Sequence, residues 1–462
     1  MTEEAFAELL RANGARVFIV GGWVRDALRH VRPHDKDYMV SGIAETDFQR
    51  LFPEAQKVGH GFPVYLVSID GALSEVAFAR KEKKEGRGYR GFRVSYDPSV
   101  TVEEDLYRRD TTMNSMALEF PGKQLIDPYH GAQDVAAKVI RAVSHHFTED
   151  PVRALRAARQ AAEFGFSITE ETIRYMNACR AELQYEPQER IVAELRRALQ
   201  SPRPSVFFRA LEQADILAVT FPELSLLIGK TQPPEYHPEG DAWQHTMQVV
   251  DRAAERTPNV AARFAALVHD IGKGTTPKEM EPHHYGHELR GLEQLDSWNR
   301  RVTLPKDWLR AGRFLIEQHM RAPLLERPGK IAALLLLVDK QRPVLSLADF
   351  NAVIEADHQS LPDYLVHGEA LLAAMHGVSG KDAPSSLAGR AVGQWLAERQ
   401  TAVLVKALAA VRARAARSLR RAARRALRGG CRSHRAAGSV SGGLDRWHWM
   451  SCARRLTARI RN

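Results

Sequence analysis

The sequence predicts an α+β protein, with a small mixed α/β head over residues 1–147 and an all-α remainder. Short apolar or alternating runs that end at glycine, typical of strands, gather in the head. From TEDPVRALRAARQAAEFGF at residue 148 onward, apolar residues recur at helical spacing. A chain of 462 residues is too long for a single core, so roughly two to four domains are expected.

The head is expected to begin with a strand, a glycine turn and a helix. The apolar run RVFIVGG at 16–22 predicts a short buried strand that ends in the turn, and VRDALRHV at 24–31 predicts the helix. Three more strand-like runs lie at 36–42, 62–71 and 73–82. The last of them, LSEVAFARKE, alternates between apolar and polar residues, which favours a half-buried strand.

Composition divides the helical remainder into four segments. Prolines separate short helices over 148–240, which we expect to form a neck, whereas 241–360 is helical and rich in histidine and aspartate. Another helical segment, a tail, is predicted over 361–410. After Ala410 the composition changes to arginine, alanine, glycine and serine, so 411–462 is predicted to be a separate extension.

The net charge of +10 comes from this extension and not from the folded body. Residues 411–462 hold 15 arginines, no lysine and one acidic residue, a net +14, so the other 410 residues carry −4. A basic chain usually indicates nucleic-acid binding. Here the body lacks that signal, and a nucleic-acid partner has to be inferred from motifs.

Neither a membrane segment nor an oxidising compartment is expected. No apolar run approaches the ~20 residues that span a bilayer, and the N-terminal MTEEAFAELLRANG is acidic, unlike a signal or transit peptide. The three cysteines, Cys179, Cys431 and Cys452, have neither disulfide nor metal spacing. This pattern favours the reduced cytoplasm.

Asp35 and Asp37 are the first candidates for catalytic chemistry. In an extended segment two residues that lie two apart point to the same face, ~6–7 Å from each other, and two such carboxylates can share Mg²⁺ with substrate phosphates. By itself a D-x-D is more often a pair of solvated acids. The preceding turn at Gly21 and Gly22, followed by Arg25, changes this weighting because exposed backbone N–H groups and a guanidinium can bind a phosphate.

Arginines further along the chain extend this candidate anion site. Arg109 lies in EEDLYRRDTTMNSMAL, and Arg153, Arg156 and Arg159 follow Asp150 at intervals of three, on one stripe of a predicted helix. The alternative is a solvated face, with Asp150 acting only as a helix N-cap.

Histidines and aspartates in the second half form a candidate metal site. The segment ALVHDIGKG places His269 and Asp270 at the polar edge of an apolar helix, and His245 and Asp357 lie on other predicted helices. Four nitrogen and oxygen ligands of this kind suit transition metals, Mn²⁺ or Mg²⁺ better than calcium. The alternative is a decayed site that serves only as scaffold.

These motifs resemble the bacterial CCA-adding enzymes, tRNA nucleotidyltransferases of the polymerase β-like superfamily. The resemblance covers most of residues 15–360 and is carried by VGGWVRDAL and DKD, ARKEKKEGRGYRGF, EEDLYRRDTTMNSMA, LIDPYHGAQDV and EDPVRALRAAR. It implies a polymerase β-like head, the only part with a sheet, and Mg²⁺-dependent, untemplated addition of CCA to the tRNA 3′ end. The implied substrates are tRNA, ATP and CTP, and the protein is expected to be a monomer or a homodimer.

The resemblance also implies roles for individual residues. Asp35 and Asp37 match the catalytic metal ligands, and Asp150 and Arg153 match the pair that reads the base. A carboxylate can accept a hydrogen bond from the exocyclic amine of C or A, but it would face a carbonyl oxygen of U or G. The nucleotide contacts implied besides this pair are Gly22, Arg25, Arg109, Arg156 and Arg159.

The second half resembles HD-superfamily phosphohydrolases. This implies His245, His269, Asp270 and Asp357 as ligands of a transition metal such as nickel, with Lys273 and His319 as phosphate or acid contacts. The implied activities are those of a phosphatase, a 2′,3′-cyclic phosphodiesterase and a 2′-nucleotidase.

Two other functions and the extension remain open at this stage. A bacterial poly(A) polymerase shares the head but lacks the HD ligands, and an inactive RNA-binding relative would not need the intact acids. The 411–462 extension departs from the family and is interpreted as disordered, as a product of a shifted reading frame, or as a basic arm on tRNA phosphates.

Overall fold

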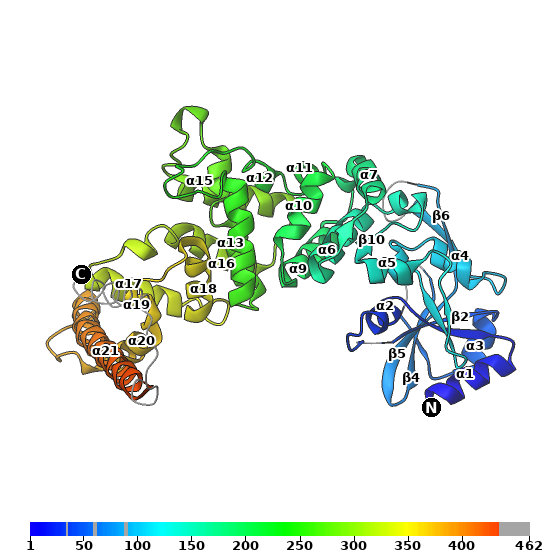
Figure 1. The fold of residues 1–462 in the computed structure, drawn as a ribbon, viewed down its shortest axis with the longest axis horizontal. Helices are drawn as coiled ribbons and strands as arrows, with labels where there is room; N and C mark the ends of the chain where they lie inside the picture. Colours follow the sequence, from blue (N-terminus) through cyan, green and yellow to red (C-terminus); the bar gives the residue numbers. More distant parts are fainter. Residues whose placement is uncertain (34–35, 59–61, 87–90, 434–462) are drawn as a thin grey trace, which may run out of the picture. The chain divides into compact units, whose positions relative to one another are not determined.

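A mixed sheet forms the centre of the head, as predicted (Figure 1), and it contains seven strands. The computed structural model describes residues 1–33, 36–58, 62–86 and 91–433. The strand order is β3-β4-β5-β2-β1-β8-β9, and β2 and β5 run parallel while the other neighbours are antiparallel. The strands are β1 (Arg16–Val20), β2 (Asp37–Ser41), β3 (Gln56–Lys57), β4 (Val64–Ile69), β5 (Ala72–Phe78), β8 (Ala117–Phe120) and β9 (Gln124–Ile126).

Both faces of this sheet are covered by apolar side chains. On one face, α1 (Glu3–Ala12) and α3 (Glu45–Leu51) contribute Phe6 and Phe48, and the Phe6 ring lies 5.7 Å from that of Tyr38. On the other face, Phe18 and Met39 pack with residues of α4 (Val102–Tyr107). Burial on both faces explains why the central strands are nearly continuous apolar runs in the sequence.

The strand predicted at 73–82 is divided in two. β5 ends at Phe78, and β6 (Lys81–Lys84) pairs with β7 (Phe92–Ser95) in a separate two-stranded sheet. Pairing partners, and not the local alternation of side chains, set this boundary. The remaining elements of the head are α2 (Gly22–Leu28), α5 (Gly131–Ala137) and β10 (Val139–Ile140).

Helices make up nearly all of the rest of the first compact unit, which covers Met1–Val366. A short strand, β11 (Ser167–Ile168), pairs with β10. The first helices are α6 (Val152–Phe164), α7 (Glu170–Ala178), α8 (Arg180–Leu183), α9 (Gln188–Gln200), α10 (Ser205–Gln213), α11 (Leu217–Thr220) and α12 (Pro222–Ser225). The later ones are α13 (Ala242–Arg256), α14 (Val260–Val268), η4 (Ile271–Thr275), α15 (His287–Arg301), α16 (Lys306–Gln318), α17 (Pro328–Asp339), α18 (Leu347–His358) and α19 (Asp363–Val366).

The second compact unit begins at His367. It contains α20 (Gly368–His376) and the long α21 (Arg390–Ser433), so the first part of the arginine-rich extension is helical. Residues 434–462 lie outside the described part of the chain. Among the described residues, no helix combines the length and the apolar character needed to cross a membrane.

One buried arginine joins the ends of two helices within the first unit. Arg263 on α14 donates to the carbonyl oxygens of Leu199 and Ser201, at 2.7 and 3.1 Å, where α9 ends. It also donates to those of Ala254 and Thr257, at 2.9 and 2.7 Å, where α13 ends. Carbonyl groups at helix C-termini lack hydrogen-bond donors within the helix, and Arg263 supplies the missing donors.

Replacing this arginine should destabilise the protein. We expect Arg263→Met to lower the free energy of unfolding by roughly 3–5 kcal/mol, because four buried carbonyl groups lose their donor. Urea denaturation measures the change. Arg256→Met, which removes an arginine at the end of α13 from the surface, should cost about 1 kcal/mol or less. Equal losses in the two variants would contradict the role given to Arg263.

Candidate functional site

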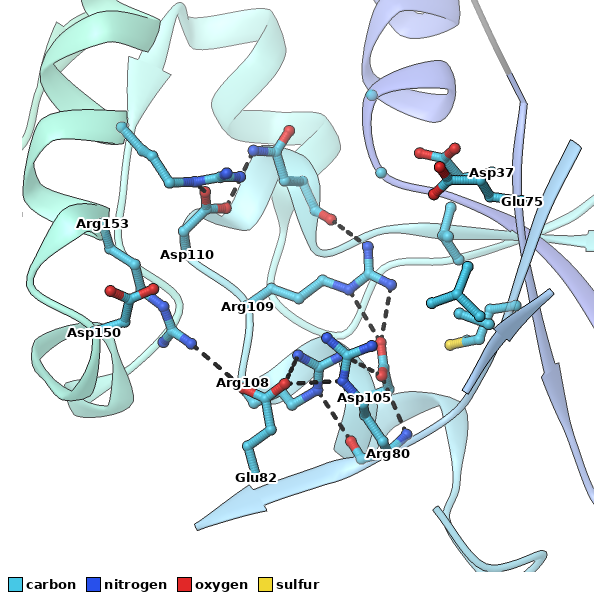
Figure 2. A pocket seen from close by; sticks show the side chains of 18 of the residues that line it. Asp37, Glu75, Arg80, Glu82, Asp105, Arg108, Arg109, Asp110, Asp150 and Arg153 are labelled. Atoms are coloured by element: carbon cyan, nitrogen blue, oxygen red, sulfur yellow. Dashed lines mark hydrogen bonds and ion pairs between the residues drawn. The ribbon is translucent and has the colours of Figure 1, made fainter. Parts of the chain in front are cut away.

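A cavity of about 1100 Å³ lies in the first unit, lined by the head sheet and by helices of the neck (Figure 2). Asp37 and Glu75 lie near one end in this view, Asp150 and Arg153 near the other, and Arg109 between them. The predicted site residues that line the cavity are Gly22, Arg25, Asp37, Arg109, Asp150, Arg153, Arg156 and Arg159. Asp35, the other predicted metal ligand of the head, lies outside the described residues.

Strand pairing brings the glycine turn close to Asp37, although the two are well separated in the sequence. β1 and β2 are antiparallel, and Val20, the last residue of β1, lies opposite Asp37, the first residue of β2. The turn at Gly21 therefore lies beside the carboxylate. Gly21 has φ +69°, a backbone conformation that favours glycine, and the Nη1 atom of Arg109 lies 3.6 Å from where a Cβ would be.

Glu75 is a second carboxylate at this end of the cavity, and the sequence analysis missed it. In the parallel pairing of β2 with β5, Tyr38 lies opposite Val76, so Asp37 and Glu75 are neighbours on the same face of the sheet. Figure 2 shows the two carboxylates close together. The alternation in LSEVAFARKE indicated that Glu75 is on the polar face of its strand, but local sequence does not reveal that β5 pairs with β2. Asp37 and Glu75 could hold a cation together.

Asn114 connects the arginines in the middle of the cavity. Its side-chain oxygen accepts a hydrogen bond from Arg25 at 2.9 Å, and its backbone oxygen accepts one from Arg109 at 3.3 Å. Its amide group donates to Asp110 at 3.1 Å. Asp105 accepts from Arg109 at 2.9 and 3.1 Å. Both arginines are thus held in place while they line the cavity.

Two buried carboxylates keep their charge in this environment. Burial alone would raise the pKa of Asp105, but Arg108 and Arg109 hold it well below its usual value. Burial acts in the same direction on Asp110, and Arg156, 2.7 Å away, likewise keeps the Asp110 pKa low. Both groups therefore stay ionised near neutral pH and stabilise their arginines.

Asp150 and Arg153 both have protein partners. Asp150 accepts from both terminal nitrogens of Arg190, at 3.0 and 2.7 Å, and from the backbone N–H of Val152 at 3.2 Å. Arg153 donates to the carbonyl oxygen of His146 at 2.7 Å. The capping contact to Val152 fits the alternative role of Asp150. Arg190 also lines the cavity and was missed, because it lies 40 residues from Asp150 in the sequence.

Arg159 differs from the other arginines of the stripe. Its Nε atom lies 2.6 Å from Glu194 on α9, and it is also paired with Glu163. The side chain is buried. Arg159 therefore lines the cavity and also joins α6 to α9 through its ion pair with Glu194.

A second cluster gathers the histidines and aspartates of the later helices. The Nε2 atom of His245 lies 3.1 Å from Asp357 and 3.6 Å from Asp270. The Nε2 atom of His269 lies 3.2 Å from Asp270 and 3.7 Å from Asp357. The four residues predicted from the sequence are therefore in one place, and Glu239, 2.6 Å from Nδ1 of His245, was not foreseen.

Several polar atoms in this cluster fit a cation. The Nε2 atom of His269, Oδ1 of Asp270 and Oδ2 of Asp357 are buried and have no hydrogen-bond partner among the described residues. Burial would lower the pKa of His245, but hydrogen bonds with Asp357 and Glu239 raise it to about 9. A cation bound at Nε2 would replace the proton there.

Lys273 and His319, predicted as phosphate or acid contacts, both contact the carboxylate of Asp270. The Nζ atom of Lys273 is 2.6 Å from Oδ2, and Nε2 of His319 is 3.3 Å from Oδ1. His287, 3.2 Å from Oδ1, completes this side of the cluster. Burial alone would raise the pKa of Asp270, but Lys273 and His269 keep it well below its usual range.

Known protein families match three parts of the chain. The Poly A polymerase head domain family matches residues 17–141, and the family described as a probable RNA and SrmB- binding site of polymerase A matches 165–227. The HD domain family matches 242–342.

Similar solved structures support the same fold. A Bacillus stearothermophilus CCA-adding enzyme solved in complex with CTP is 22% identical, with a TM-score of 0.61 over 87% of this chain and 93% of that one. A Thermotoga maritima CCA-adding enzyme complexed with tRNA is 19% identical, with a TM-score of 0.56 over 88% and 94%. The polymerase-type head followed by a helical body is therefore confirmed.

Curated relatives identify the family. The Multifunctional CCA protein of Xanthomonas euvesicatoria pv. vesicatoria (strain 85-10) is 40% identical over 410 residues, 85% of this chain and 98% of the relative. That of Actinobacillus pleuropneumoniae serotype 5b (strain L20) is 38% identical over 353 residues, 74% of this chain and 85% of the relative. With this identity over nearly the whole length of a relative, the chain belongs to the family of multifunctional CCA proteins.

Proposed function

We propose that this protein adds CCA to the 3′ end of tRNA, from CTP and ATP and without a nucleic-acid template. The observation that carries the proposal is the cavity, in which a carboxylate pair, a glycine turn and fixed arginines meet. The name that these relatives carry, Multifunctional CCA protein, supports the addition of CCA. They also favour this function over a poly(A) polymerase or an inactive RNA-binding protein.

Asp37, together with Asp35 and Glu75, is proposed to hold Mg²⁺. The donors are carboxylate oxygens, the ligands that Mg²⁺ prefers, and the strand register places Asp37 and Glu75 side by side. When bound, Mg²⁺ would activate the terminal hydroxyl of the RNA and neutralise charge on the departing pyrophosphate.

Arg25 and Arg109 are proposed to bind the triphosphate beside the glycine turn. Both guanidinium groups are already held by Asn114, so little of their conformational freedom is left to lose when the anion binds. Arg156 is held in the same way by Asp110. A cluster of fixed positive charges of this kind suits a nucleoside triphosphate.

Asp150 and Arg153 are proposed to read the base. Each carboxylate oxygen of Asp150 accepts from Arg190 and has lone-pair capacity left, so it can also accept from the amine of C or A. U and G present an oxygen at the corresponding position and would be repelled. Arg190 holds the carboxylate in its orientation.

We further propose that the HD domain hydrolyses phosphate esters, as a phosphatase, 2′,3′-cyclic phosphodiesterase and 2′-nucleotidase. Buried side-chain atoms of His269, Asp270 and Asp357 that make no hydrogen bond among the described residues support a metal ion that is held with His245. Imidazole ligands favour a later transition metal such as nickel over Mg²⁺. When bound, such an ion would activate water at neutral pH.

Removing the carboxylate of Asp37 or of Glu75 should slow nucleotide addition. We expect Asp37→Ala to lower the rate of CMP and AMP incorporation into tRNA by at least ~10³-fold, and Glu75→Gln by at least ~10-fold, because charge on the leaving pyrophosphate is no longer neutralised. Incorporation of labelled nucleotide into tRNA that lacks its 3′ end measures this. Glu54→Gln, on the surface of the same head, is the control. More than a few per cent of residual activity in Asp37→Ala would refute the metal assignment.

Base selection should depend on Asp150. We expect Asp150→Ala to let UTP or GTP enter, raising their incorporation relative to CTP by ~10-fold or more, since the repulsive carboxylate is gone. Sequencing of the product after incubation with all four nucleotides measures the choice, and Glu149→Gln is the neighbouring control. If selectivity is unchanged and all nucleotides bind equally weakly, Asp150 is only a helix cap.

The HD cluster should be separable from nucleotide addition. We expect His269→Ala to abolish hydrolysis of 2′,3′-cyclic nucleotides and to leave CCA addition within ~2-fold of the wild type, because the two sites use different ligands. His283→Ala, which changes an exposed histidine, should affect neither activity. A loss of tRNA extension in His269→Ala would show that His269 holds the helical body together instead.

A further inference from the structure

We propose that Tyr236 and Tyr285 form an aromatic rim beside the HD cluster and stack on the base of a nucleoside phosphate. The inference rests on the proposed hydrolase function of this cluster and deepens it, because it assigns residues to the part of the substrate that is not phosphate. Phosphate esters of nucleosides are then good substrates, and phosphate esters without a base are poor ones.

The two tyrosines are among the most exposed large side chains that the structure describes. Tyr236 is 81% exposed and Tyr285 is 72% exposed. An aromatic ring offers a large apolar face, and these two rings bury little of it within the fold. Single exposed apolar residues are common on protein surfaces, so the position of these two decides what they can do.

Tyr236 lies on a strap, residues 232–239, and both ends of the strap are bound to the HD cluster. The first residue of the strap is a glutamine, whose side-chain oxygen accepts a hydrogen bond from Nζ of Lys273 at 2.7 Å. The last is a glutamate, whose carboxylate lies 2.6 Å from Nδ1 of His245. Tyr236 is therefore carried across the cluster between two anchored ends.

The backbone of the strap is rigid where it presents Tyr236. Three of its eight residues are prolines, which restrict φ. The N–H groups of Tyr236 and His237 both donate to the carbonyl oxygen of Pro233, at 3.1 and 3.0 Å, and close a turn. A ring on such a turn loses little backbone freedom when a base stacks on it.

Tyr285 lies on a second segment, which is bonded to the residue before the strap. The Nε2 atom of His284 lies 2.9 Å from the carbonyl oxygen of Thr231. The carbonyl oxygen of Tyr285 accepts a hydrogen bond from Arg290 at 2.9 Å. The backbone on both sides of the Tyr285 side chain is thus held while the ring stays exposed.

Both tyrosines are close along the chain to residues of the cluster. Tyr236 directly precedes His237, whose ring lies 4.8 Å from that of His245. Tyr285 is two residues before His287, whose Nε2 atom lies 3.2 Å from Asp270. Consecutive Cα atoms are about 3.8 Å apart, so a phosphate ester bound at the cluster has its base near these rings.

Stacking of this kind selects nucleosides without selecting one base. Every nucleobase has a π-face, and stacking on an aromatic side chain contributes to binding whichever base is present. A rim of two tyrosines therefore distinguishes a nucleoside phosphate from a phosphate ester that has no ring.

A comparison of two phosphomonoesters tests the proposal. The full chain is assayed with Ni²⁺ on adenosine 2′-phosphate and on glycerol 2-phosphate, and the readout is the ratio of the two kcat/KM values. We expect Tyr236→Ala and Tyr285→Ala each to lower this ratio by ~10-fold or more, through a higher KM for the nucleotide, because a stacking partner of the base is lost. Tyr236→Phe and Tyr285→Phe keep the ring and should retain the ratio within ~3-fold of the wild type.

Tyr185→Ala is the matched control. Tyr185 is 61% exposed and lies between α8 and α9, outside the HD domain. Its replacement should leave the ratio unchanged. The same assay with a short RNA that ends in a 2′,3′-cyclic phosphate, beside adenosine 2′,3′-cyclic phosphate, distinguishes an RNA end from a free nucleotide as the source of the base.

A binding measurement tests the rim without catalysis. Titration calorimetry follows adenosine 2′-phosphate and inorganic phosphate in the Arg109→Ala background, which removes a proposed nucleotide contact of the head. We expect Tyr236→Ala to weaken binding of the nucleotide by ~10-fold and to keep the affinity for inorganic phosphate within ~2-fold.

An unchanged ratio in both alanine variants, or equal losses with the two esters, would overturn the proposal. These results are distinguishable from a failure of the proposed function. Hydrolysis of both esters with an unchanged ratio would keep the hydrolase and remove the rim. Binding of the nucleotide that depends on the two rings, without any hydrolysis, would keep the rim and remove the hydrolase.

Discussion

The antiparallel pairing of β1 with β2 is the constraint on which the head site depends. It places the end of β1, and the glycine turn that follows, directly beside Asp37. Side chains alternate between the two faces of a strand, so a shift of the register by one residue would turn Asp37 into the aromatic core and Tyr38 toward the cavity. Burial of both faces resists such a shift, since Tyr38 and Met39 pack on opposite sides. The packing of the core therefore sets the position of a proposed metal ligand.

Buried acids fix the positions of the arginines that line the cavity. Asp105 holds Arg109, and Asp110 holds Arg156, with distances below 3 Å in each pair. A buried pair of this kind costs desolvation energy, and the additional hydrogen bonds around it offset part of that cost. The result is a set of positive charges that keep their geometry before an anion arrives, which is what binding and orienting a triphosphate requires.

The two proposed sites offer two different sets of metal ligands within one chain. The head offers carboxylates, while the HD cluster adds imidazole nitrogens, and the function proposed above assigns Mg²⁺ to the first and a transition metal to the second. Close backbone approach positions the second cluster, because Gly272 lets η4 meet α15. Glycine is thus needed at both sites. Gly21 adopts a positive φ, and Gly272 has no side chain that would collide with the backbone of α15.

The sequence by itself determined the order of a mixed-sheet head and a helical body, the glycine turn that precedes the acids along the chain, the arginine stripe and the four candidate HD ligands. These features are local: they depend on the periodicity of apolar residues and on short motifs, which a strand or helix converts directly into shared faces. Only the tertiary structure decided that Glu75 joins Asp37, that Arg190 holds Asp150, and that His287 and His319 face Asp270. Each of these contacts joins residues on separate elements, and pairing of strands or packing of helices over such distances leaves no spacing pattern in the chain.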